Sequence, residues 1–141
     1  MPDLKMDAAA LRRFLKDEFP QVEGMFRIES VAPMQARVVL PVRDEHLRPG
    51  GTVSGPSMFA LADVGVYLAI LAMVGPKALA VTTGCSIDFM RKPDAARDLV
   101  ADVELLKLGR QLAVGDVRIW SQGCPERPVA RASLTYSLPN A

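Results

Sequence analysis

The feature that most constrains this fold is a long helix with no polar face. Residues 56–74 are almost entirely apolar, and no Lys or Arg occurs between Arg48 and Lys77. A proline in the expected first turn and a Gly-Pro pair after the last turn suit the two ends of a helix. The stretch is slightly short for a membrane span, and it carries Asp63 near its middle. We therefore predict a core helix that protein must cover on nearly all sides.

Asp63 is the one charged residue of that helix. A carboxylate in apolar surroundings is costly to ionise unless neighbouring groups hold it. Proteins accept this cost most often where the group has a chemical task. The other interpretation is a structural Asp that hydrogen-bonds to backbone, and the helix alone does not decide between the two.

The composition indicates a single domain, residues 1–141, with one hydrophobic core. Half of the 141 residues are hydrophobic and the net charge is +1, so nucleic acid and an anionic membrane are not expected as partners. Two cysteines and one histidine are too few for a disulfide framework or a histidine-rich metal site. The first residues lack the apolar run of a secretory signal. We expect a cytoplasmic protein with no metal and no cofactor.

Hydrophobic periodicity predicts an α+β chain with a curved antiparallel sheet around the long helix. Asp7 is a suitable cap for a first helix, and Pro20 ends it. The predicted elements are a short helix within residues 1–20, strands at 25–31 and 34–42, a loop at 43–55, the helix at 56–74, and four strands between 79 and 138, at 79–91, 99–108, 112–121 and 129–138.

Three short segments carry motifs in a fixed order. Gly51-Thr-Val-Ser-Gly-Pro56 leads into Leu61-Ala62-Asp63; Thr83 to Pro93 contains Asp-Phe-Met-Arg; and Gly109-Arg110-Gln111 forms a turn. Together with the element order, they resemble the hotdog-fold acyl-CoA thioesterases of the phenylacetic-acid-degradation (PaaI-like) type. That family has a Gly-x-x-His-Gly-Gly loop, a Leu-Ala-Asp helix, a strand ending in Asp-Phe-Leu-Arg-Pro and a Gly-Lys/Arg turn. The resemblance covers roughly residues 25–138 and implies a hotdog fold.

The resemblance implies hydrolysis of an acyl-CoA thioester to the free acid and CoA. Asp63 would act as nucleophile or general base. Gly55, whose N–H lies unpaired at a helix N-terminus, would donate to the developing oxyanion. A Ser or Thr of the following strand, here Thr83, faces the acid across the subunit interface in family members.

Two departures from the family pattern concern supporting groups. Ser54 stands where the family usually has His, and Arg48 where it often has Asn. Pro56 replaces the second Gly and removes one backbone donor. Ser54 could bond the substrate, orient water or simply cap the helix.

Coenzyme A carries phosphates, so basic side chains are expected at the mouth of such a site. The candidates lie at strand ends or turns: Arg91, Lys92, Lys107 and Arg110. The acyl group is expected to lie along the helix between two subunits of a homodimer or homotetramer. The expected lining residues are Met58, Phe59, Ala62, Val66 and Tyr67.

Three other residues are expected to be chemically inert. His46 is predicted to be a solvent-exposed loop histidine. A related dehydratase group has an acid about fourteen residues after its His, and from His46 that distance leads to Ala60. Cys85 is predicted to lie in the core, and Cys124 in a turn.

Three alternatives to a thioesterase stay open. The first is a non-catalytic hotdog protein that binds acyl-CoA as a sensor or carrier, which the missing His and Asn favour and the retained acid disfavours. The second is a hotdog dehydratase or hydratase, and the third is a purely structural protein.

Overall fold

The computed structural model describes residues 3–76 and 79–139, which form one six-stranded sheet with two α-helices. The sheet is antiparallel throughout, in the order β1-β2-β4-β5-β6-β3. The elements are α1 (Ala8–Glu18), β1 (Arg27–Ala32), β2 (Gln35–Leu40), the short 3₁₀ helix η1 (Asp44–His46), α2 (Gly55–Val74), β3 (Val81–Phe89), β4 (Leu99–Leu108), β5 (Leu112–Ser121) and β6 (Ala130–Ser137).

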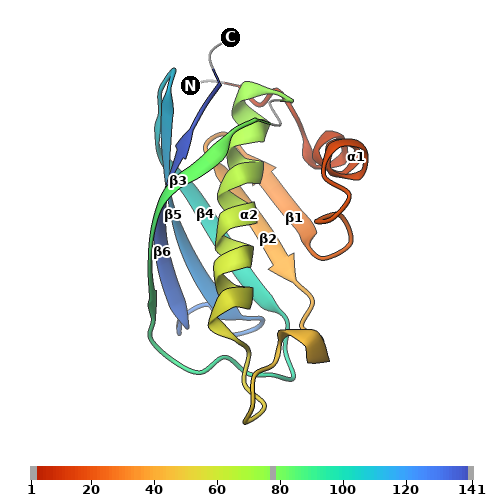
Figure 1. The fold of residues 1–141 in the computed structure, drawn as a ribbon, viewed down its shortest axis with the longest axis vertical. Coiled ribbons are helices and arrows are strands. Elements are labelled where there is room, and N and C mark those ends of the chain that lie inside the picture. Colours follow the sequence, from red (N-terminus) through yellow and green to blue (C-terminus); the bar gives the residue numbers. More distant parts are fainter. Residues whose placement is uncertain (1–2, 77–78, 140–141) are drawn as a thin grey trace.

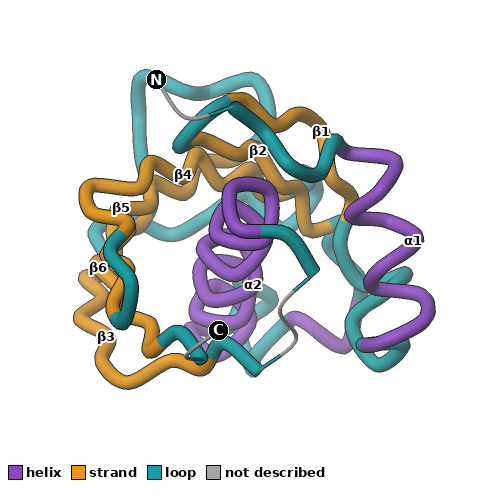
Figure 2. Tube along the Cα trace, turned by 90° about the horizontal axis from the view of Figure 1, so that it is seen from above, coloured by secondary structure: helices purple, strands orange, loops and turns teal. Residues whose placement is uncertain are grey.

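The sheet curls around α2 (Figures 1 and 2). Seen along the helix, the strands enclose one side of α2 and α1 lies beside β1 (Figure 2). This is the hotdog architecture, so the predicted fold is confirmed. The element boundaries differ from those predicted by one to two residues at most ends.

Local chemistry accounts for the helix ends. Asp7 accepts a hydrogen bond from the Ala10 N–H at 2.8 Å and so caps α1. Gly75 ends α2 with a φ of 93°, which glycine adopts without strain. The helix begins at Gly55 and not Pro56, because Ser54 takes the cap position.

The core lies between α2 and the concave face of the sheet. Thirteen of the twenty residues of α2 are buried, which its lack of a polar face requires. The helix approaches β4 so closely that a Cβ on Gly65 would lie 2.9 Å from Cγ2 of Val103. Although α2 is long and apolar enough to cross a membrane, most of it is buried inside this fold.

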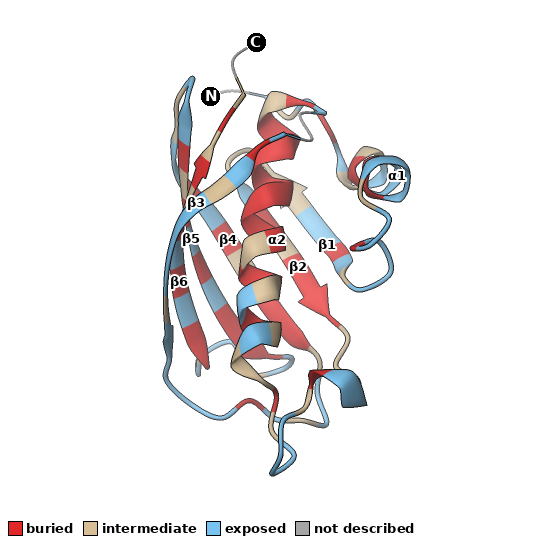
Figure 3. Ribbon diagram, in the orientation of Figure 1, coloured by how far each residue is buried: buried red, intermediate tan, exposed pale blue. Residues whose placement is uncertain are grey.

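One side of the N-terminal half of α2 is not covered by the chain (Figure 3). Strand β3 lies at the edge of the sheet beside it and pairs only with β6, and seven of its nine residues are exposed. Several large apolar side chains are exposed in this region: Phe59, Leu79, Val81, Phe89 and Met90. A strand with one edge unpaired and with exposed apolar side chains, lying beside an apolar helix, is unusual for a monomer.

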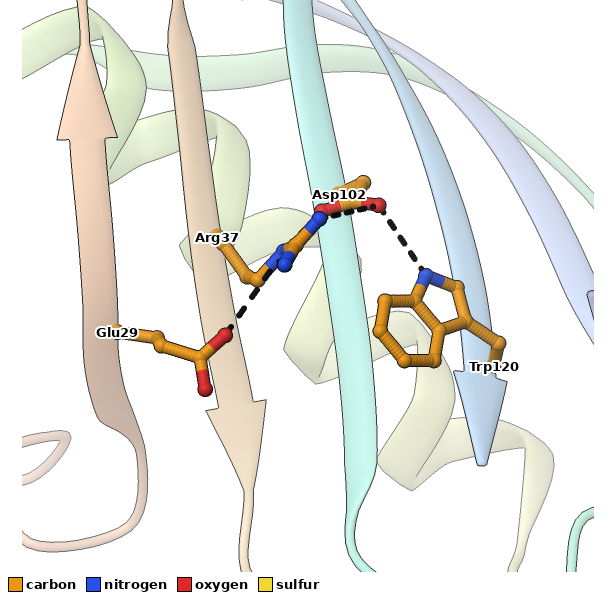
Figure 4. A network of polar contacts seen from close by, with 4 residues as sticks. All are labelled: Glu29, Arg37, Asp102 and Trp120. Atoms are coloured by element: carbon orange, nitrogen blue, oxygen red, sulfur yellow. Dashed lines mark hydrogen bonds and ion pairs between the residues drawn. The ribbon is translucent and has the colours of Figure 1, made fainter. Parts of the chain in front are cut away.

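The convex face of the sheet carries a polar network that joins four strands (Figure 4). Nε of Arg37 donates to Oδ1 of Asp102 at 2.6 Å and lies 3.8 Å from Oε2 of Glu29. The Trp120 indole N–H donates to Oδ2 of the same Asp102 at 3.2 Å. The hydrogen bond to Asp102 raises the pKa of Arg37, so its charge persists at all working pH values. The network is partly exposed and adds modest stability.

The close helix–sheet contact at Gly65 predicts the effect of a single methyl group. Gly65→Ala should lower the free energy of unfolding by about 1–3 kcal/mol, because the added Cβ overlaps the side chain of Val103. Thermal or urea unfolding measures this change. The double variant Gly65→Ala/Val103→Ala should recover part of the loss, and a Gly65→Ala protein more stable than wild type would contradict the packing described.

Candidate active site

Asp63 lies on the third turn of α2 and is held by two hydroxyl groups from neighbouring strands. Thr82 Oγ1 donates to its Oδ1 at 2.5 Å, and the Tyr136 hydroxyl donates to the same oxygen at 2.8 Å. The Tyr136 hydroxyl also lies 2.8 Å from the backbone oxygen of Asp63. These contacts provide the support that a carboxylate in an apolar helix needs.

A cavity of about 370 Å³ opens beside this carboxylate. Its lining combines α1, α2, β3 and β6: Glu18, Phe19, Asp63, Val64, Tyr67, Ala80, Val81, Thr82 and Tyr136. The rings of Tyr67 and Tyr136 stack with centroids 6.3 Å apart, and Phe19 meets Tyr67 edge-on at 6.0 Å. Burial first, and then the charge of Asp63, raise the pKa of Tyr136, so this hydroxyl stays protonated.

At the start of α2, one backbone donor is left without a partner. The Ser54 N–H bonds to the His46 carbonyl at 2.8 Å. The Ser57 N–H bonds to Ser54 Oγ at 3.3 Å, and Pro56 has no N–H. Among the first N–H groups of the helix, only that of Gly55 has no acceptor within the described residues. It points from the positive end of the helix dipole.

Gly55 borders a second cavity, of about 600 Å³, with three basic side chains around it. Arg48, Arg91 and Lys92 are all exposed and all line it. Its wall also contains Thr52, whose hydroxyl is buried and has no hydrogen-bond partner in the described chain. The cavity therefore offers cations and unsatisfied donors together, which suits a phosphorylated or anionic ligand.

His46 supports the loop that precedes α2. The prediction of an exposed loop histidine is wrong, because His46 is only 6% exposed. The Arg43 N–H donates to its Nδ1 at 2.8 Å, and its carbonyl accepts from Ser54. A bridge between Leu47 and Val53 closes the loop above it. These contacts set the position of the helix N-terminus.

The structure does not bring Gly55 and Asp63 together within one chain. They are eight residues apart on the same helix, which corresponds to about 12 Å along its axis. Lys107 and Arg110 lie farther still, lining a cavity at the C-terminal end of α2 together with Lys5. One chain thus presents two separate halves of the predicted site.

Thr83 does not contact Asp63 in this chain, whereas Thr82 does. The β3–β6 register pairs Thr82 with Tyr136 and Gly84 with Thr135, so Thr83 is the extra residue of a β-bulge. Its hydroxyl lies 3.4 Å from the Thr135 carbonyl and is exposed. Whether Thr83 faces the acid of a second subunit stays a prediction.

The prediction of a core position for Cys85 is wrong, because the residue is exposed. Its register partner Leu134 is fully buried, so Cys85 is on the helix-facing side of β3 but nothing in the described part of this chain covers it. Desolvation of the sulfur and the charge of Asp63 raise the pKa of the thiol, which makes it a poor nucleophile. Cys124 lies in the turn between β5 and β6, as expected.

The structure separates the five residues predicted to line the acyl group. Ala62 and Val66 are fully buried against the sheet and cannot touch a ligand. Phe59 is 37% exposed, Tyr67 lines the cavity at Asp63, and Met58 lines the cavity at Gly55.

Sequence reasoning missed Thr52, Thr82 and Tyr136. A hydroxyl in an alternating strand carries no signal of its own. Tyr136 could have been found only by asking which donor satisfies Asp63, since no basic residue is near it in sequence.

Comparison with known proteins adds one family match and three similar proteins. Residues 50–127 match the family described as Thioesterase superfamily. A candidate thioesterase from Silicibacter sp. TM1040, of known crystal structure, is 55% identical with a TM-score of 0.90, over 97% of this chain and 94% of that one. A mutant of the phenylacetic acid degradation protein PaaI from Thermus thermophilus is 30% identical with a TM-score of 0.73, over 85% and 99% of the two chains. A candidate esterase of Pseudomonas aeruginosa is 33% identical over 116 residues, which are 82% of this chain and 84% of that one.

The geometry of Ser54 predicts a structural role. Its hydroxyl bonds both the Ser57 N–H and the Ser57 hydroxyl, the latter at 2.7 Å. Ser54→Ala should cost about 1 kcal/mol of stability, as loss of an N-cap does, with little change in any turnover rate. Thermal unfolding and steady-state kinetics measure the two effects. A large fall in kcat with unchanged melting would assign Ser54 to the chemistry.

Proposed function

The chain belongs to the thioesterase superfamily, and we propose that it hydrolyses an acyl-CoA thioester. The observation that carries the proposal is the lone carboxylate of α2, half-buried, held by hydroxyl groups and open to a cavity. The unpaired Gly55 N–H and the cations around it support the same reaction. The proposed location is the cytoplasm, where free thiols such as those of Cys85 and Cys124 persist.

The reaction consumes one water molecule and releases one carboxylic acid and the CoA thiol. In one route Asp63 takes a proton from water as the water oxygen attacks the carbonyl carbon, and that proton passes to the departing sulfur. In the other, Asp63 attacks the carbon and CoA leaves as the thiolate; water then hydrolyses the mixed anhydride, one of its protons going to the thiolate and the other to the released acid, and Asp63 is again a carboxylate. In both routes the Gly55 N–H stabilises the oxygen that becomes negative.

The active site is proposed to form between two copies of the chain. Gly55 and Asp63 of one chain are about 12 Å apart along α2, too far to act on one carbonyl group. A second copy related by a two-fold axis, with its α2 antiparallel, would bring its Gly55 toward Asp63. The exposed apolar edge formed by β3 and Phe59 is the surface available for it. The proposed assembly is therefore a homodimer, or a tetramer of two such dimers.

The phosphates of CoA are assigned to the basic residues at the start of α2. Arg48, Arg91 and Lys92 border the Gly55 cavity. Lys107 and Arg110 occupy the opposite end of the same helix. In the proposed antiparallel arrangement, Lys107 and Arg110 of one copy would lie near the start of α2 in the other copy. Their role in CoA binding stays a prediction.

A non-catalytic acyl-CoA binder is the second candidate function. The hydroxyl of Ser54, which replaces the family His, is already engaged in the helix cap. With Arg48 in place of the family Asn as well, the chain lacks both of these supporting groups of the family, while retaining the acid.

Thiol release from a panel of CoA esters tests the proposal against this second candidate. The panel is phenylacetyl-, benzoyl-, acetyl-, hexanoyl- and palmitoyl-CoA, with wild type beside Asp63→Asn. We expect at least one ester to be hydrolysed, with kcat lower by about 100-fold or more in Asp63→Asn and the melting temperature retained. Equal turnover in the variant would overturn the mechanism. Saturable binding without release of thiol would support the acyl-CoA binder.

Mixing two inactive variants tests whether the site is shared between copies. Asp63→Asn removes the acid, and Gly55→Pro removes the N–H donor. In a shared site, a mixed dimer holds one intact pair, so equal mixing after unfolding and refolding should restore about a quarter of wild-type activity.

Gly55→Ala is the matched control for this mixing experiment. It keeps the N–H but adds a Cβ that would lie 3.2 Å from the Phe89 ring. No recovery on mixing, with mixed dimers shown by mass spectrometry, would place both groups in one chain's site.

A further inference from the structure

We infer that Tyr136 is a positioning residue for the reaction proposed above: with Thr82, it holds Oδ1 of Asp63 so that Oδ2 is the oxygen that reacts. The inference rests on the proposed function and adds to it a role for a residue of β6. It also assigns different tasks to the two carboxylate oxygens.

The hydrogen bonds to the Asp63 carboxylate all fall on one of its two oxygens. Both hydroxyl donors, at 2.5 and 2.8 Å, contact Oδ1. No donor contacts Oδ2 within the part of the chain that the structure describes. A carboxylate oxygen that accepts two hydrogen bonds has its lone pairs engaged, whereas the other oxygen is free to accept a proton or to attack carbon.

Tyr136 is placed so that its hydroxyl cannot readily leave this position. The side chain is 3% exposed and its ring stacks on Tyr67. Its hydroxyl also contacts the backbone oxygen of Asp63, so the same group touches both the carboxylate and the backbone of α2. Tyr136 and Thr82 are direct partners in the β6–β3 register, and this pairing places both hydroxyl groups next to Oδ1 of Asp63.

The local charges favour a permanent donor at this position. Burial and the charge of Asp63 both disfavour the phenolate form, so the pKa of Tyr136 lies above its usual value and the hydroxyl keeps its proton. The other titratable groups around Asp63 are Glu18 from α1, Tyr67 from α2 and Cys85 from β3. The two hydroxyls that reach the carboxylate are those of Thr82 and Tyr136.

A purely structural tyrosine is the competing interpretation. In that case the Tyr136 hydroxyl would only join α2 to β6, and its removal would lower stability without altering the chemistry. The two interpretations predict different pH dependences, because a donor to the ionised carboxylate stabilises that form.

Tyr136→Phe removes the donor and keeps the ring. We expect kcat to fall about ten-fold, with KM changed less than about two-fold, and the acid limb of the pH–rate profile to move up by about one pH unit. Wild-type kcat and an unmoved acid limb would overturn the inference. So would a fall in kcat with an unmoved limb, since that result indicates altered packing alone.

Thr82 provides a test that does not alter the aromatic packing. Thr82→Val removes the hydroxyl and keeps the shape, and Thr82→Ser keeps the hydroxyl. We expect Thr82→Val to resemble Tyr136→Phe and Thr82→Ser to resemble wild type; equal losses in both would overturn the role of the hydroxyl. Thr135→Val, at a half-exposed position on β6 beside Tyr136, is the matched control and should leave kcat and the profile unchanged.

A measurement without substrate separates this inference from the proposed function. In protein labelled with ¹³C at the aspartate carboxyl carbons, the Asp63 resonance is identified by its absence in Asp63→Asn. Its titration midpoint should lie at higher pH in Tyr136→Phe than in wild type. If no CoA ester is hydrolysed, the thioesterase proposal fails while this shift still tests the positioning. An identical midpoint in both proteins would overturn the positioning by itself.

Discussion

The burial of α2 is the constraint on which the rest of the structure depends. A helix of twenty residues without a polar face is stable in water only where other elements exclude water from it. A curved sheet covers one side of such a cylinder, and α1 adds cover beside β1 (Figure 2). The close contact of Gly65 with Val103 shows how tightly the sheet encloses the helix. What remains uncovered is the N-terminal half of α2 next to β3 (Figure 3).

The candidate site lies along the boundary of this incomplete cover. The first turn of α2 presents the unpaired Gly55 N–H. The two residues that follow add no free donor, because Pro56 has no N–H and the Ser57 N–H bonds to Ser54. Farther along the same helix, Asp63 meets hydroxyl groups from two strands. Both features face regions that the chain leaves partly open. The surface proposed for a second copy is therefore the surface on which the chemistry is proposed.

Particular residues show how far sequence reasoning reached. The cap at Asp7 and the end of α2 at Gly75 follow from short-range rules, and both occur as predicted. The bulge at Thr83 is not a short-range property: Thr83 is the extra residue of β3, and within one chain Thr82 is the residue of this strand that contacts Asp63. The prediction for His46 is wrong because a loop rich in Gly and Pro is usually exposed, whereas this loop buries the imidazole and bonds to it through the Arg43 N–H.

The amino-acid sequence by itself determined that one apolar helix with a single carboxylate must be covered on nearly all sides, because the helix has no polar face that could stay in contact with water. It also determined the position of Gly55 at a capped helix start, since capping depends on neighbouring residues. Only the tertiary structure decided which groups satisfy Asp63. Tyr136 is 73 residues away along the chain, and its hydroxyl reaches the carboxylate through strand register. The separation of Gly55 from Asp63 follows from their spacing on one helix. Only the tertiary structure shows that α2 has an open side next to β3, where a second copy could lie.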